Sequence, residues 1–228
     1  MEALHKILNF VWEKEEIPDD WKRGLLVKLA KKGDLSLCGN WRGIMLLSIP
    51  SKVLTRVILN RMKVAVDEAL RDEQAGFRKD RSCIDQIATL RIIVEQTIEW
   101  SSPLYLLFVN FEKAFDALDR EAMWRILHHY GIPNKIINMR KVQYQGFTCQ
   151  VLHGGTMTEP IEVKAGVRQG CLLSPLLFLV VLDWVSMKAY EGKRLGLQSS
   201  LTQCLEDLDY ADDLCLLTHR LADMKVKG

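Results

Sequence analysis

The sequence lacks the features that mark several specialised classes of protein. None of its six cysteines belongs to a CxxC pair, so neither a zinc site nor a redox motif is indicated. Because the chain is neither short nor dense in cysteine, we expect reduced thiols and an intracellular location, with nucleus and cytoplasm equally open. The N-terminus has no basic segment followed by a continuous apolar stretch, which argues against a secretory signal.

Long apolar runs are absent as well. The longest, LLSPLLFLVVLDWV at residues 172–185, is too short to span a bilayer and is interrupted by Ser, Pro and Asp. No membrane is therefore expected among the partners. Internal repeats, low-complexity tracts and linkers are also missing. With 228 residues, 48% of them apolar, and a net charge of only +2, the chain is predicted to form one large globular domain or two small ones.

Positive charge is concentrated in one stretch near the N-terminus. Residues 22–42 carry six cations against a single anion, Asp34. The cations are Lys22, Arg23, Lys28, Lys31, Lys32 and Arg42. A phosphate-binding surface has this pattern, and so does a solvated basic face. A second basic cluster, QAGFRKDRS at 74–82, includes an aromatic residue and suits either tracking of a nucleic-acid strand or simple surface exposure.

Hydrophobic periodicity predicts a mixture of helices and strands. The expected helices cover 1–15, 51–70 with Ser51 as the cap, 84–98, a segment capped by Asp119, and a nearly all-apolar, buried segment opened by Ser174-Pro175. The expected strands cover 24–30, 104–111, a hairpin across 147–163 around Gly154-Gly155, and a strand–turn–strand at 204–219. Cys171 and Cys215 stand in apolar company and are expected in the core. The fold class is α+β.

Two stretches are candidates for metal chemistry. In Tyr210-Ala211-Asp212-Asp213, two carboxylates follow a strand, as in a surface turn or at a rigid hairpin tip that binds divalent cations. Two such cations stabilise the attacking and leaving oxygens of a phosphoryl transfer, but they need a further carboxylate from a neighbouring strand. The natural donor is the end of the strand in LFVNFEKAFDAL, where the polar residue is Asn110.

A third candidate is the loop GVRQGC at 166–171. Glycines on both sides of Gln169 let the backbone approach a ligand such as a nucleotide or template, although a purely structural loop has the same composition. A phosphate-binding P-loop is excluded, because no Lys-Ser/Thr pair follows the second glycine.

Five motifs together have the order and spacing of one family. They are NWRGIMLLS (40–48), EQAGFRKDRSCIDQI (73–87), LFVNFEKAFDAL (107–118), GVRQGCLLSPLLF (166–178) and YADD (210–213). The chain resembles the reverse transcriptase region of LINE-type, non-LTR retrotransposons. The resemblance implies the fingers (1–100) and palm (101–228) of a right-hand polymerase, with an antiparallel palm sheet and with the thumb missing after YADD.

The resemblance also implies RNA-templated DNA synthesis with Mg²⁺, or Mn²⁺, as the two metal ions. An RNA template, a DNA primer and dNTPs would be the partners; oligomeric state is not indicated. Asp212 and Asp213 match the metal-binding pair, and Asn110 takes the position of the family's first catalytic aspartate. Phe115 matches the aromatic gate that selects dNTPs. The remaining nucleotide-binding positions are Lys31, Lys32, Arg42, Gln169 and Gly170.

Asn110 departs from the family pattern, because an amide brings an oxygen but no charge. Glu112 would replace the missing carboxylate only if the strand continued through residue 112. We therefore expect an impaired polymerase. The alternatives are a non-catalytic nucleic-acid-binding remnant and a translated relic without function. An unrelated nuclease that uses carboxylates to bind metal ions is a poorer explanation, because it would not account for the Gln-Gly loop or for the gate aromatic.

Overall fold

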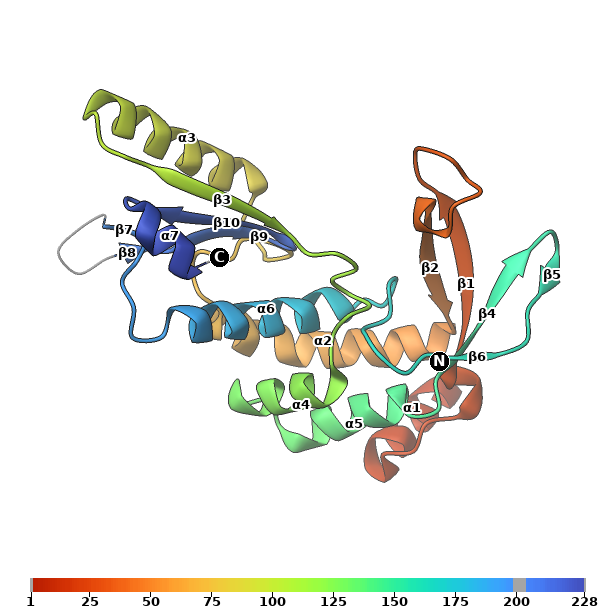
Figure 1. The fold of residues 1–228 in the computed structure, drawn as a ribbon. Helices are drawn as coiled ribbons and strands as arrows, with labels where there is room; N and C mark the ends of the chain where they lie inside the picture. The colour runs from red at the N-terminus through yellow and green to blue at the C-terminus, as the bar shows by residue number, and fades with distance from the viewer. Residues whose placement is uncertain (1, 199–203, 228) are drawn as a thin grey trace. The chain divides into compact units, whose positions relative to one another are not determined.

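The computed structural model describes residues 2–198 and 204–227 (Figure 1). These residues form two compact units. The first unit comprises Met1–Ala65 and Phe115–Phe178, and the second comprises Val66–Ala114 and Leu179–Gly228. Each unit thus combines segments from both sides of residue 100. The division into fingers and palm at that residue stays a prediction.

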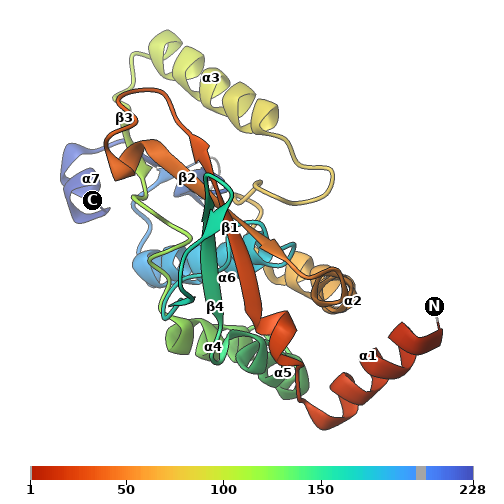
Figure 2. The same cartoon turned by 90° about the vertical axis from the view of Figure 1, so that its right-hand side faces the viewer.

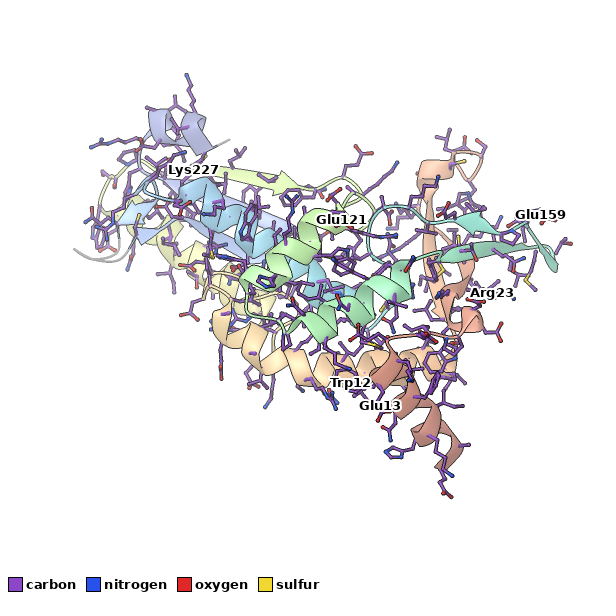
Figure 3. The ribbon with its side chains drawn as sticks, turned by 90° about the horizontal axis from the view of Figure 1, so that it is seen from below. Trp12, Glu13, Arg23, Glu121, Glu159 and Lys227 are labelled. Atoms are coloured by element: carbon purple, nitrogen blue, oxygen red, sulfur yellow. The ribbon has the colours of Figure 1, made fainter. Side chains whose placement is uncertain are left out.

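The first unit is built on a sheet with strand order β2-β1-β4-β5, and β6 pairs with β4 (Figure 2). Its strands are β1 (Arg23–Ala30), β2 (Trp41–Leu47), β4 (Thr148–His153), β5 (Thr156–Met157) and β6 (Ile161–Glu162). Its helices are α1 (Glu2–Lys14), α4 (Arg120–His129) and α5 (Asn134–Tyr144), with short 3₁₀ turns at Asp19–Lys22 and Cys38–Asn40. Trp12 of α1 is labelled in Figure 3. The centroid of its ring lies 4.4 Å from the guanidinium carbon of Arg61 and 5.6 Å from the Nζ of Lys135, and both are cation–π contacts.

Two long helices contain residues of both units: α2 (Ile49–Ala69) and α6 (Ser174–Tyr190). The apolar composition of α6 agrees with its burial, since most side chains from Ser174 to Asp183 are buried.

The second unit holds a three-stranded antiparallel sheet with order β3-β10-β9. Its strands are β3 (Tyr105–Asn110), β9 (Asp207–Tyr210) and β10 (Asp213–Thr218), and a separate pair is β7 (Leu197–Gln198) with β8 (Cys204–Leu205). Its other helices are α3 (Cys83–Glu99) and α7 (Leu221–Lys227).

Alternation along the central strand β10 buries both faces of this sheet. Cys215 and Leu217 belong to a core that Leu90 and Ile93 of α3 cover. Leu214 and Leu216 belong to a second core that includes Met224 of α7. Figure 1 shows α3 running beside β3, with α7 close to β10. The strand that begins at Asp213 is therefore packed from both sides, which makes it a rigid support for the turn before it.

The α7 helix is also held by a buried cation. Lys227, labelled in Figure 3, has a side chain only 1% exposed. Its Nζ donates to the carbonyl oxygens of Glu206 at 2.8 Å and Leu217 at 3.0 Å, and it also meets the Glu206 carboxylate.

Most of the local predictions are confirmed. The helix over 84–98 begins after Ser82, whose hydroxyl accepts the amide of Ile84, and the Asp119 carboxylate caps α4 through the amide of Ala122. The hairpin turns at Gly154-Gly155, where φ values of 57° and 80° suit glycine in a two-residue turn. All six cysteines are free, and Cys171 and Cys215 are buried. No helix among the described residues is long and apolar enough to cross a membrane.

Two predicted helix caps were wrong, and the strand β2 and the helices α5 and α7 were not predicted. Ser51 lies inside α2, which begins at Ile49, so it is not the cap. Ser174 is the first residue of α6 rather than the residue before it. The helix α5 was not predicted, because no side chain caps its start and Arg140 and Gln143 are buried among its apolar residues.

Candidate active site

The Asp-Asp pair lies in a tight turn between two strands of the second unit. Tyr210 at the end of β9 pairs with Asp213 at the start of β10, which leaves Ala211 and Asp212 as the two turn residues. Asp213 is exposed and Asp212 is half-buried. The predicted strand–turn–strand is thus confirmed, with both carboxylates at its tip.

Strand register brings Asn110 to this tip. Asn110 is the last residue of β3, and it pairs with Asp213 across the antiparallel ladder. Directly opposed residues point to the same face of a sheet, with Cβ atoms about 5 Å apart. The structure therefore places Asn110, Asp212 and Asp213 together at one edge of one compact unit.

The donor set suits a divalent cation. Among the described residues, neither the side chain of Asp212 nor that of Asp213 forms a hydrogen bond or an ion pair, so their carboxylate oxygens are available to a ligand. Carboxylate and amide oxygens are the hard ligands that Mg²⁺ takes, usually with several waters retained. The described part of the chain has no group of three or more His, Cys, Asp or Glu side chains arranged for a metal ion. The tip accordingly offers two carboxylates and one neutral oxygen.

Glu112 does not extend this set. The strand β3 ends at Asn110, and residues 112–114 form a turn in which Lys113 has a φ of 52°. The condition for replacing the missing carboxylate, a strand that continues through residue 112, is not met.

A buried ionic cluster lies in the same unit. Arg71 donates to Asp183 at 3.0 Å, to Asp207 at 2.9 Å and to Asp209 at 3.0 Å, and all three carboxylates are fully buried. The hydroxyl of Tyr190 also hydrogen-bonds Asp207. One guanidinium thus joins the helix α6 to the strand β9, which leads into the Asp-Asp turn.

Three carboxylates around one cation cannot all ionise without cost. Burial, followed by the charge of Asp207, raises the pKa of Asp209 to about 8, while burial raises the pKa of Asp207. At neutral pH the folded cluster therefore holds a proton that the unfolded chain, with an ordinary aspartate, releases.

This proton makes stability depend on pH. Because the folded-state pKa of Asp209 exceeds its unfolded value, the stabilisation is complete below pH 4 and is lost as pH rises through about 8. We expect the free energy of unfolding, measured with urea, to fall by about 2–3 kcal/mol between pH 6 and pH 8.5. Asp209→Asn should flatten this slope, whereas Asp72→Asn, at an exposed site, should keep it. An unchanged slope in Asp209→Asn would contradict the assignment.

Sequence reasoning missed this cluster, although two signals were present. Asp183 is the single charge within the apolar stretch 172–185, and Asp207 and Asp209 alternate with Leu208 along one strand. Buried charges need partners, so each pattern indicated an ionic contact inside the fold.

The predicted nucleotide-binding loop lies in the first unit, with Phe115. The carbonyl of Gln169 accepts the amide of Met45 in β2 at 2.8 Å, and the amide of Val167 donates to the carbonyl of Phe115 at 2.7 Å. The side-chain amide of Gln169 donates to the Asp116 carboxylate at 3.2 Å. The structure thus brings Phe115 and Gln169 to one loop system.

Glycine is required at both ends of this loop. At Gly170 φ is +98° and a Cβ would lie 2.6 Å from the carbonyl oxygen of Met45. At Gly166 φ is +71° and a Cβ would meet the carbonyl oxygen of Asp116 at 2.6 Å. The Phe115 ring stacks on Phe178 of α6, with centroids 4.9 Å apart.

The predicted cations lie at the free end of the β1–β2 ladder. Lys31 follows β1, and its amide donates to the carbonyl of Asn40 just before β2, while Arg42 pairs with Leu29. Lys31, Lys32 and Arg42 are all exposed. These residues share one end of a hairpin; their role in phosphate binding stays a prediction.

In the second basic cluster, the guanidinium groups of Arg78 and Arg81 form ion pairs within the fold. Arg78 donates to the Asp67 carboxylate at 2.6 Å and to the backbone carbonyls of Asp67, Arg71 and Gln74. Arg81 meets the Asp72 carboxylate at 2.5 Å. The hypothesis that this segment tracks a nucleic-acid strand is therefore wrong for Arg78, whose guanidinium is used within the fold.

Comparison with known proteins assigns the chain to a family. Residues 29–227 match the family described as "Reverse transcriptase (RNA-dependent DNA polymerase)". The chain belongs to the reverse transcriptase family. As a family, reverse transcriptases synthesise DNA on RNA from dNTPs and use divalent metal ions.

Relatives of this reverse transcriptase domain confirm the resemblance to non-LTR retrotransposons. It is 30% identical to "Transposon TX1 uncharacterized 149 kDa protein" of Xenopus laevis, over 97% of the chain and 17% of that protein. It is 27% identical to the "Retrovirus-related Pol polyprotein from type-1 retrotransposable element R2" of Popillia japonica, over 88% of the chain and 28% of the relative. The domain thus spans less than a third of each of these relatives.

Solved structures support the fold of the reverse transcriptase domain. Apo telomerase from Candida tropicalis matches with a TM-score of 0.67 at 15% identity, over 96% of the chain and 49% of the telomerase chain. Telomerase from Candida albicans, in complex with a fragment of telomeric RNA, matches with a TM-score of 0.63 at 11% identity, over 96% and 41%. At such identities the likeness shows the fold alone, and it agrees with the predicted polymerase architecture.

Proposed function

We propose that this domain carries the nucleotidyl-transfer site of a retrotransposon reverse transcriptase, and that Asn110 impairs it. The observation that carries the proposal is the pairing of Asn110 with Asp213 beside Asp212. In this arrangement a primer 3′-hydroxyl loses its proton and attacks the α-phosphorus of a dNTP paired to an RNA template. The new phosphodiester bond replaces the bond to the α,β-bridging oxygen, and pyrophosphate leaves. Two divalent cations, when bound, neutralise the charge that develops on the attacking and leaving oxygens.

Residues of the chain bind the cations, the sugar and the triphosphate. Asp212 and Asp213 hold the cations through free carboxylate oxygens, and Asn110 contributes an amide oxygen without charge. Phe115, backed by Phe178, closes the space below the sugar of the incoming nucleotide. Gln169 and Gly170 present the loop to the nucleotide, and the exposed Lys31, Lys32 and Arg42 bind its triphosphate.

Primer extension tests this function. The unmodified chain and its Asn110→Asp variant are supplied with an RNA template, a DNA primer, dNTPs and Mg²⁺. The proposal expects extension by the variant and very weak extension by the unmodified chain. Equal extension by both would remove the assigned role of Asn110, and extension by neither would favour the second candidate.

The second candidate is a non-catalytic nucleic-acid-binding domain, which the exposed cations on the β1–β2 hairpin favour. Template–primer binding should weaken steeply with salt, because phosphate contacts release counterions. Lys31→Gln and Arg42→Gln should each lower the salt slope by about one. Lys6→Gln, at an exposed lysine that pairs with Glu2, is the matched control and should leave the slope unchanged. Binding that ignores salt would contradict a phosphate-binding role for this hairpin.

A further inference from the structure

The sequence of the Asp-Asp turn does not itself favour the backbone conformation that the turn adopts. Its first residue, Ala211, has a φ of +58°, in the left-handed region that residues with a Cβ rarely adopt. Two-residue hairpin turns usually place Gly or Asn at such a position. Because alanine gives the turn no local preference for this conformation, contacts from elsewhere must fix it.

The segment 73–76 supplies those contacts within the same unit. The amide of Ala75 donates to the carbonyl of Asp209 at 2.9 Å, and the amide of Asp209 donates to the carbonyl of Glu73 at 3.1 Å. The segment thus lies parallel to β9, with Gln74 bridged to Asp209. Gly76 lies so close to the turn that a Cβ on it would be 2.1 Å from the Ala211 nitrogen.

The side chain of Gln74 makes the decisive contact. It is fully buried, and its Oε1 accepts the amide of Ala211 at 3.2 Å and the amide of Gly76 at 2.8 Å. Among the described residues, the Ala211 amide donates to no other acceptor. A neutral amide oxygen accepts both bonds without adding a charge to a strand that already carries Asp207 and Asp209.

We propose that Gln74 is a positioning residue for the metal-binding turn. By holding the Ala211 amide, it fixes the strained turn in the conformation that presents Asp212 and Asp213 beside residue 110. The role in catalysis rests on the proposed function, whereas the hydrogen bond and the turn geometry do not. The segment 73–76 is therefore a support of the polymerase site.

Residue-resolved hydrogen exchange by NMR tests the contact directly. In Gln74→Met, which keeps the length of the side chain but removes the acceptor, the Ala211 amide should exchange about tenfold faster or more. Leu216, in the middle of β10, is the internal reference and should keep its rate. A rise shared equally by Leu216 would mean general destabilisation, and an unchanged Ala211 rate would mean no contact; either result overturns the proposal.

Extension in the Asn110→Asp background tests the positioning role. Gln74→Met should raise the Mg²⁺ concentration for half-maximal extension at least about fivefold, because the two carboxylates are no longer held in place. The control is Thr97→Val, which removes a buried hydroxyl bonded to Ile93 and Val94, away from the turn.

The outcomes separate the two claims. An Mg²⁺ requirement in Gln74→Met no higher than in Thr97→Val would overturn the positioning role. Absence of extension by Asn110→Asp itself would count against the proposed function, and hydrogen exchange alone would then decide whether Gln74 holds the turn.

Discussion

Replacing Asn110 with aspartate is expected to raise the rate of Mg²⁺-dependent primer extension by about a thousandfold or more. Asn110 lies directly across the ladder from Asp213, so a carboxylate there would complete three anionic ligands at one edge of the sheet. A shared anionic ligand contributes several kcal/mol to the transition state of a two-metal transfer, and about 1.4 kcal/mol corresponds to a factor of ten in rate.

Two variants control for this effect. Asn110→Asp combined with Asp212→Asn should return to the level of the unmodified chain, because the restored carboxylate then lacks its partner. Asn9→Asp makes the same charge change on the exposed surface of α1 and should have no effect. A comparable gain from Asn9→Asp would show that net charge, rather than the position of the carboxylate, sets the rate.

Removing Arg71 is expected to cause the largest loss of stability. Arg71→Met would leave the buried carboxylates of Asp183, Asp207 and Asp209 without their shared cation. Removing one partner of a buried ion pair lowers the free energy of unfolding by about 3–5 kcal/mol, because an uncompensated charge remains inside the protein. For a chain of this length, we expect the melting temperature to fall by roughly 6–20 °C.

The pH dependence of this loss identifies its cause. At pH 5 more of the carboxylates take up protons, so the drop in melting temperature should be smaller than at pH 8. Arg91→Met is the control, because Arg91 pairs with Glu95 on the exposed face of α3 and should leave the melting temperature unchanged. Equal losses at both pH values would show that packing around Arg71, rather than charge, holds the cluster together.

Local patterns predicted the elements that carry the site. The apolar runs before Asn110 and after Asp213 predicted two strands, and YADD predicted the turn before the second, because a buried strand appears in the sequence as a short continuous apolar run. Glycines at Gly154-Gly155 marked a hairpin because their backbone conformation favours glycine. Ordered motifs then indicated which polar residues belong together.

Contacts between distant parts of the chain were not predictable in this way. The register that places Asn110 opposite Asp213, the sharing of Arg71 by three carboxylates, and the bond from Gln74 to Ala211 all join segments more than a hundred residues apart. Periodicity reports which face of an element is apolar, and it does not report which buried polar groups meet. For the same reason, Arg78 looked like a surface cation although its guanidinium is enclosed by the fold.

Metal affinity tests the central claim most directly, because it does not depend on primer, template or turnover. Binding of Mn²⁺, followed by electron paramagnetic resonance, should be compared for the unmodified chain, Asn110→Asp and the Asn110→Asp/Asp212→Asn double variant. If Asn110 occupies a ligand position at an otherwise intact site, Asn110→Asp should bind Mn²⁺ at least about tenfold more tightly than the other two proteins. Equal affinities in all three would contradict the account.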